Sequence, residues 1–203
     1  MSNKLPTLVE IQSAPSSSTS PLAHTLDLLF EHSPVLVNVL EPQVSAALKS
    51  STGPLASYAH LVEIALAELA KWNDEAQAQF IAGHPHIGES KNLSALSSKE
   101  QGAALPTPTP PEVLARLEYL NACYEKKYPG LRYITFVNGR SRAVIAAEME
   151  GVLGLAPDDT PAPESISSEG TEFGSRWWKA ELRRAVHDIG MIAKSRLGPL
   201  GAK

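Results

Sequence analysis

The sequence of 203 residues has one cysteine, Cys123, and no long run of basic or apolar residues. A single cysteine excludes a disulfide framework and a tetrahedral zinc site built on cysteines, and it fits a reducing compartment. With a net charge of −4 and no cluster of Lys and Arg, the chain lacks the electrostatic footprint of a nucleic-acid-binding protein. No apolar run approaches the ~20 residues that span a bilayer.

Targeting signals are also missing. The N-terminus lacks the charged-then-apolar pattern of a secretory signal, and the last three residues, Gly201-Ala202-Lys203, are not a Ser-Lys-Leu peroxisomal address. We therefore expect a soluble protein, cytoplasmic or peroxisomal, with neither nucleic acid nor membrane as a partner. Apolar residues make up 43% and charged residues 20% of the chain, which is enough apolar material for a core.

Helical periodicity dominates the chain, so the sequence predicts an all-α protein. We expect one compact domain over residues 20–200, a bundle of seven to eight helices. Helices are expected over residues 21–30, 35–40, 55–72, 74–82, 97–104, 111–128, 141–153 and 175–197. Capping residues support several starts: Ser20 before Pro21, Asn73, and a capping box from Thr109 to Glu112. A break is expected near Pro42.

Three segments depart from this pattern. Residues 1–19, rich in Ser and Pro, are expected to form a flexible arm, and the acidic, Pro-rich residues 155–172 an exposed insertion. Residues 131–137 (LRYITFV) are β-branched and aromatic, which favours an extended backbone. With no second strand to pair with, the backbone groups of this segment need partners from helix ends or from a ligand.

The strongest candidate for chemistry is residues 83–101, GHPHIGESKNLSALSSKEQ. His84 follows a glycine at a helix end, and Pro85 stiffens the turn. Histidine titrates nearest to neutral pH, so His84 is a candidate general acid or base. The alternatives are a plain surface turn or a metal site with His86, although two histidines leave a metal short of a third ligand.

Ser97, Glu100 and Gln101 form a second polar cluster. Their spacing also matches a capping box, in which Ser97 and Glu100 serve only the helix. As a functional cluster, their hydroxyl, carboxylate and carboxamide groups suit a ligand rich in urea-like N–H and C=O groups. Arg196, near the end of the last helix, is either a surface cap or a ligand-binding residue.

Several stretches together resemble the 2-oxo-4-hydroxy-4-carboxy-5-ureidoimidazoline (OHCU) decarboxylase family. The resemblance covers residues 20–200 in consistent order. It rests on GHPHIG at 83–88, Leu93-Ser-Ala-Leu-Ser97-x-x-Glu100-Gln101, Asn121-x-x-Tyr124-x-x-Lys127-Tyr128, the extended 133–137, Gly139-Arg-Ser-Arg142 and Ile192-Ala-Lys-Ser-Arg196-Leu. The family is all-α and converts OHCU, a small molecule of urate breakdown, to (S)-allantoin and CO2 without a cofactor. Its members are often dimers, so a homodimer is a possible assembly.

The resemblance also implies roles for single residues. His84 matches the catalytic histidine, and Glu100 would orient either His84 or the ureido N–H groups of the substrate. The implied substrate contacts are Pro85, Ser97, Gln101, Tyr133, Ile134, Thr135, Phe136, Val137 and Arg196. No metal ligand is implied.

Some residues depart from the family pattern. His86 stands where many members have an acid, and Asn138 stands where many have an arginine. If that arginine binds the substrate carboxylate, Arg140 or Arg132 must replace it. Two other functions compete with decarboxylation: a helical interaction module without activity, and a metal-dependent amidohydrolase of the same pathway.

Overall fold

The computed structural model describes residues 4–89, 94–100 and 108–202. These residues form helices and contain no β-strand, which confirms the all-α fold class. They group into two compact units: the first runs to His84 and resumes at Val186, and the second spans Pro85–Ala185. Helix α9 (Arg176–Leu197) therefore supplies residues to both units. The single domain expected over residues 20–200 stays a prediction.

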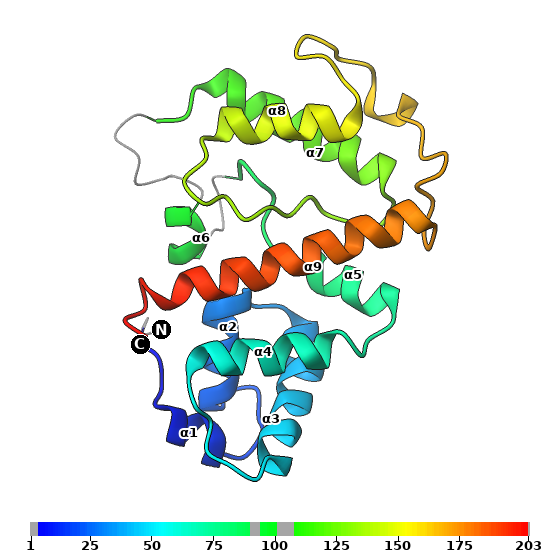
Figure 1. Ribbon diagram of the computed structural model, residues 1–203. Helices are drawn as coiled ribbons and strands as arrows, with labels where there is room; N and C mark the ends of the chain where they lie inside the picture. Colours follow the sequence, from blue (N-terminus) through cyan, green and yellow to red (C-terminus); the bar gives the residue numbers. More distant parts are fainter. Residues whose placement is uncertain (1–3, 90–93, 101–107, 203) are drawn as a thin grey trace. The chain divides into compact units, whose positions relative to one another are not determined.

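Among its described residues, the first unit holds five α-helices and one π-helix before α9 (Figure 1). The α-helices are α1 (Leu8–Ser13), α2 (Pro21–Phe30), α3 (Glu41–Ser50), α4 (Tyr58–Leu69) and α5 (Asp74–Ala82). Their apolar faces form a core in which the largest fully buried side chains include Phe30, Phe80, Leu26, Leu36 and Leu61. The expected caps are confirmed: Ser20 accepts a hydrogen bond from the N–H of Ala23, and Asn73 from that of Ala76.

The sequence predicted a break near Pro42, but the backbone does not break there. It continues through the π-helix η1 (Leu36–Leu40) directly into α3. Proline lacks an N–H group, and its ring crowds the carbonyl four residues back, so a helix that keeps a proline has to adjust the preceding turn. Here that turn is widened, because the N–H of Glu41 bonds to the carbonyl of Leu36, five residues back.

The N-terminal segment differs from the flexible arm that we expected. Thr7 and Glu10 form a capping box that starts α1, and Ile11 is buried. The buried carboxylate of Glu41 accepts hydrogen bonds from the hydroxyls of Ser16 and Ser20, at 2.5 and 2.6 Å. A buried carboxylate needs such donors, and they tie the Ser-rich stretch to the start of α3.

The second unit is built around α7 (Pro111–Lys127) and α8 (Arg142–Leu153), which lie side by side (Figure 1). It also contains α6 (Ala95–Glu100) and a short 3-10 helix, η2 (Pro163–Ser165). Its buried side chains include Leu117, Leu120, Tyr124, Ile145, Met149 and Trp178. Residues 131–137 have no regular structure, in agreement with the extended segment that we expected.

The capping box predicted from Thr109 to Glu112 is wrong. Helix α7 begins at Pro111, and no side chain caps it. Two consecutive prolines remove two of the N–H groups that a cap would satisfy, and the N–H of Val113 bonds to the carbonyl of Pro110. The hydroxyl of Thr109 instead accepts a hydrogen bond from Arg142.

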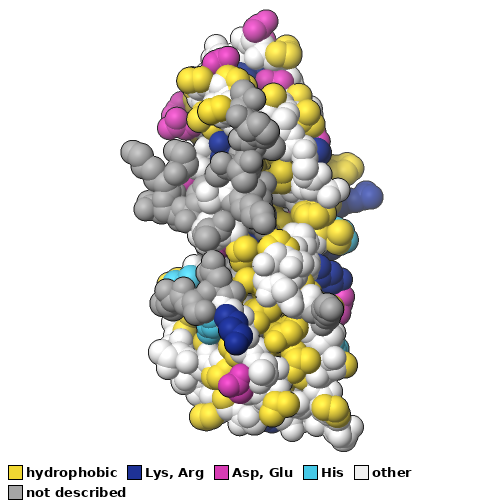
Figure 2. Space-filling model, turned by 90° about the vertical axis from the view of Figure 1, so that its left-hand side faces the viewer, with side chains coloured by type: hydrophobic (Ala, Val, Ile, Leu, Met, Phe, Trp, Pro, Cys, Tyr) yellow, Lys and Arg dark blue, Asp and Glu magenta, His cyan; other side chains and the backbone are white. Residues whose placement is uncertain are grey.

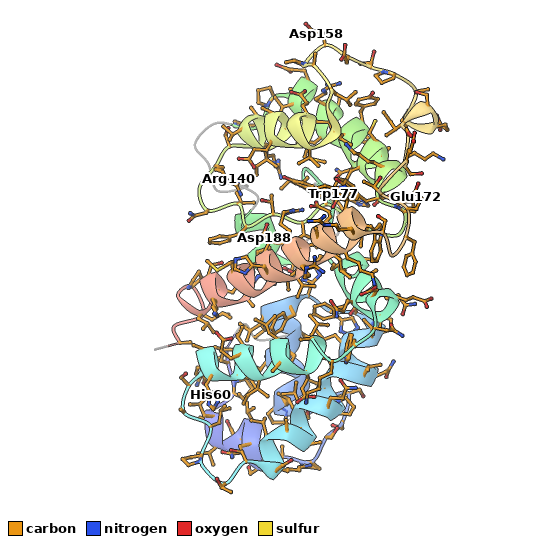
Figure 3. All side chains as sticks on the ribbon, turned by 45° about the vertical axis from the view of Figure 1, so that its right-hand side comes forward. His60, Arg140, Asp158, Glu172, Trp177 and Asp188 are labelled. Carbon is orange, nitrogen blue, oxygen red and sulfur yellow. The ribbon has the colours of Figure 1, made fainter. Side chains whose placement is uncertain are left out.

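The acidic segment 155–172 is tied to α7 by its backbone. Arg116 donates hydrogen bonds to the carbonyls of Ala156 and Asp159, at 2.9 and 2.7 Å. The hydroxyl of Tyr119 donates to the carbonyl of Pro161 at 2.7 Å. The acidic side chains stay at the surface, and Asp158 lies at the tip of this loop (Figure 3).

The surface mixes apolar with polar and charged side chains, as the face shown in Figure 2 illustrates. Among the described residues, the large apolar side chains with the most exposure are Val9, Trp177 and Phe173. No helix in the described part of the chain is long and apolar enough to cross a membrane.

Candidate functional site

His84 is held in a fixed position directly after α5. Its N–H bonds to the carbonyl of Ile81 at 3.0 Å. The preceding residue, Gly83, packs tightly: a Cβ added there would lie 2.8 Å from the Cβ of Ser33. Only glycine allows the two backbones to approach this closely, so the chain reversal before His84 is locked against the start of η1.

The imidazole of His84 is buried, with 4% of the residue exposed. Its Nδ1 lies 3.3 Å from the carbonyl oxygen of Phe80, and its ring meets the Phe80 ring edge-on, with 5.6 Å between centroids. A carbonyl can only accept, so Nδ1 carries the proton and Nε2 carries the lone pair. His84 is therefore oriented with Nε2 as its basic nitrogen.

Arg196 is also buried, within the first unit. Its Nη2 lies 2.6 Å from Oε1 of Glu31, and its Nη1 donates to the carbonyls of Leu28 and Leu29 at 3.2 and 3.3 Å. Those carbonyls belong to the last turn of α2, which lacks partners within the helix and favours a positive charge. Arg196 thus caps α2 and pairs with Glu31, which follows that helix with φ at 65°.

These groups set the charge of His84. Burial, together with the positive charge of Arg196, lowers the pKa of His84 to about 4, although Glu31 acts in the opposite direction. The imidazole is therefore neutral near pH 7 and can accept a proton. Arg196 is 2% exposed to solvent. Its positive charge is balanced by Glu31 within the same cluster.

The depressed pKa predicts that folding is sensitive to acid. Unfolded histidine titrates near ~6.5 and folded His84 at about 4, so between these values the unfolded state binds more protons. Stability is then retained above pH ~6.5 and lost as the pH falls, by about 2 kcal/mol at pH 5. Urea unfolding at pH 7 and 5 should show this loss in the wild type and not in His84→Asn. An equal loss in both proteins would contradict the assignment.

In the second unit, the extended segment is held by two arginines. Arg184 donates to the carbonyl of Ile134 at 2.7 Å, and Arg140 donates to the carbonyls of Phe136 and Val137. Within the described residues, the N–H groups of residues 133–137 donate no hydrogen bond. Guanidinium groups are thus the partners of three of the carbonyls, which the sequence left open.

The turn after this segment suits an asparagine at position 138. Asn138 and Gly139 have φ of 46° and 78°, and the N–H of Arg140 bonds to the carbonyl of Val137 at 2.9 Å. Asparagine and glycine adopt this left-handed conformation with less strain than other residues. Arg140, which is labelled in Figure 3, is engaged with Glu148 and with the hydroxyl of Thr135, and Arg132 lies 3.7 Å from Glu125.

The polar cluster near α6 is only partly described. Ser97 lies inside α6 and is buried, and its N–H bonds to the hydroxyl of Ser94 at 3.0 Å. Ser94 therefore caps the helix, and the capping box that starts at Ser97 is wrong. Pro85 is half-buried. The side chain of Glu100 and the whole of Gln101 lie outside the described residues.

His86 turns toward α7. Its Nε2 lies 2.7 Å from Oε1 of Glu125, and its N–H donates to Glu89 at 3.1 Å. In the described ranges, no three side chains of His, Cys, Asp or Glu gather in a way that could hold a metal ion. The side chain of His86 thus contacts Glu125 at the surface.

Sequence reasoning missed two residues that shape these sites. Glu31 follows a helix with no motif around it, and only the fold shows that it pairs with Arg196. Arg184 lies off the apolar stripe of α9, so it resembled an ordinary surface arginine. Neither role could be recognised from the sequence, because Glu31 and its partner are 165 residues apart and Arg184 and its partner are 50 residues apart.

Comparison with known families gives one match. The model of the family described as OHCU decarboxylase matches residues 15–160, more than half of the chain. The match includes His84, Ser97 and the extended segment, whereas Arg184 and Arg196 lie beyond its end. No curated protein matches the chain.

Proposed function

Because the chain belongs to the OHCU decarboxylase family, whose members are carboxy-lyases of purine degradation, we propose that it converts OHCU to (S)-allantoin and CO2 without a cofactor. The observation that carries this proposal is the buried, neutral imidazole of His84 in a cluster with Arg196 and Glu31. A general base needs its lone pair available at the working pH, and a pKa of about 4 provides this.

The reaction breaks the bond between the ring carbon and the carboxylate of OHCU. The carboxylate leaves as CO2, and the electron pair of that bond passes into the adjacent imidazolinone ring. Nε2 of His84 accepts the proton of the substrate hydroxyl and, once charged, returns a proton to one face of the ring. The one net proton that replaces CO2 comes from water and neutralises the ring nitrogen. Proton transfer by a positioned imidazole contributes on the order of 10²–10⁴ in rate.

A buried site strengthens this chemistry. Fixed charges and dipoles act more strongly where water is excluded, and they need no reorganisation during the reaction. Delivery of the proton from one fixed imidazole accounts for a single stereoisomer, because only one face of the ring receives it. The N–H groups of residues 133–137 are suited to carbonyl and carboxylate oxygens of the substrate. Pro85, Ser97, Glu100 and Gln101 remain predicted contacts.

Family membership argues against both alternatives. A helical interaction module has no reaction to catalyse, and a metal-dependent amidohydrolase cleaves an amide bond rather than releasing CO2. The homodimer and the cytoplasmic or peroxisomal location remain predictions.

The direct test follows circular dichroism during urate breakdown. Urate is treated with urate oxidase and hydroxyisourate hydrolase, with and without this protein, and the (S)-allantoin signal is recorded. We expect its rapid appearance with the protein, both before and after dialysis against a chelator. A rate equal to the spontaneous decay, or a racemic product, would refute the proposed reaction. Loss of activity after chelation would refute its independence from metal.

A further inference from the structure

Arg184 joins the last helix to the extended segment by several contacts at once. Its Nη1 donates to the carbonyl of Ile134 at 2.7 Å, and its guanidinium lies 5.1 Å from the centroid of the Tyr133 ring. Its Nε and Nη2 donate to the two carboxylate oxygens of Glu181, at 3.0 and 2.6 Å. A guanidinium held at both edges and stacked on a ring has little freedom to move.

Glu181 is in turn fixed by α7. The hydroxyl of Tyr124, a fully buried residue, donates to Oε1 of Glu181 at 2.6 Å. The Tyr124 ring also meets the Tyr133 ring edge-on, with 5.2 Å between centroids. Tyr124, Glu181 and Arg184 therefore form a closed network that reaches the extended segment through both a backbone carbonyl and a side chain.

This network and Arg140 together decide which backbone groups the segment can offer. Ile134, Phe136 and Val137 have their carbonyls occupied by arginines. Within the described part of the chain, the N–H groups of residues 133–137 have no acceptor. An extended segment without neighbouring strands would otherwise sample many conformations. With three of its carbonyls anchored, it holds its N–H groups in fixed directions, available to a ligand.

We propose that Arg184, supported by Glu181 and Tyr124, is a positioning residue that holds segment 133–137 in the conformation that binds acceptor oxygens of the substrate. The inference rests on the proposed function, since it assigns this segment to substrate binding. Arg184 acts through the segment and not on the reacting atoms. Its removal therefore weakens substrate binding more than it slows the chemical step.

The test compares Arg184→Gln with Arg183→Gln, the adjacent arginine, which is exposed on the same helix. Initial rates of (S)-allantoin formation are measured over a range of OHCU concentrations, and the melting temperature is recorded for each protein. We expect Arg184→Gln to raise KM about tenfold with a smaller change in kcat, which corresponds to about 1.4 kcal/mol of binding. Arg183→Gln should keep the wild-type KM, and Arg184→Lys should fall between the two.

A second variant keeps the test decisive if Arg184→Gln does not fold. Tyr124→Phe removes only the hydroxyl that holds Glu181, so KM should still rise, by about twofold to threefold. A folded Arg184→Gln protein with the wild-type KM would overturn the inference, as would an unchanged KM in Tyr124→Phe. Failure of the proposed function itself is distinct, because the wild type would then form no (S)-allantoin above the spontaneous rate.

Discussion

Replacing His84 by asparagine should lower the rate of (S)-allantoin formation by about 10²- to 10⁴-fold, the range expected for loss of a general acid or base. Asparagine is the informative substitution because its amide nitrogen takes the place of Nδ1. It can still donate to the carbonyl of Phe80, the contact that orients the imidazole. Asparagine offers no titrating nitrogen in the place of Nε2. The variant thus keeps the anchor of the side chain and loses its chemistry.

The matched control is His60→Asn, because His60 is exposed on α4 (Figure 3). It should keep the wild-type rate. Both variants should show the circular dichroism of a helical protein and cooperative unfolding at pH 7. A folded His84→Asn enzyme with turnover within a factor of a few of the wild type would exclude His84 as the acid–base group. The source of the proton would then have to be another side chain.

Glu31→Gln should cost about 3–5 kcal/mol in the free energy of unfolding, because it removes the carboxylate charge that lies 2.6 Å from the buried guanidinium of Arg196. Unfolding in urea at pH 7 measures this loss. Replacing both partners by apolar residues should cost far less than the two single losses together, since no charge then remains buried. The double variant Glu31→Met with Arg196→Met provides this comparison.

The control is an exposed ion pair that joins α9, the helix of Arg196, to α4. Lys194 of α9 lies 2.5 Å from Glu63, and both side chains are largely exposed. Exposed pairs contribute about 0–1 kcal/mol, so Glu63→Gln should hardly change the midpoint of unfolding. Equally small effects of Glu31→Gln and Glu63→Gln would contradict the prediction, because the charge of Arg196 would then not depend on Glu31.

Local signals predicted much of the fold. Ser20-Pro21, Asn73 and the Asn138-Gly139 turn work through the backbone of adjacent residues, so the sequence suffices to recognise them. The capping boxes predicted at Thr109 and Ser97 were wrong, and in both cases the reason lies in neighbouring residues. Two prolines remove the N–H groups in the first case, and in the second Ser94 caps the helix three residues earlier.

The long-range contacts could not be predicted from periodicity. Glu41 precedes a proline, and no sequence motif around it predicts that its buried carboxylate accepts hydrogen bonds from Ser16 and Ser20. For the candidate site, motif resemblance pointed to His84 and the extended segment. The resemblance did not reveal the side chains that set the pKa of His84 or those that hold the conformation of the extended segment. Those depend on burial and on which charges meet in space.

The order of the chain in the first unit has a consequence for synthesis. Arg196 reaches back to Leu28 over 168 positions, whereas residues 85–185 form the second unit without interruption. Contacts of such large sequence separation form late, because a long loop must close before they form. During translation, the second unit can fold once Ala185 has emerged, before the rest of α9. Arg196 joins the surroundings of His84 later, so a chain shortened before Arg196 would lack the guanidinium that pairs with Glu31.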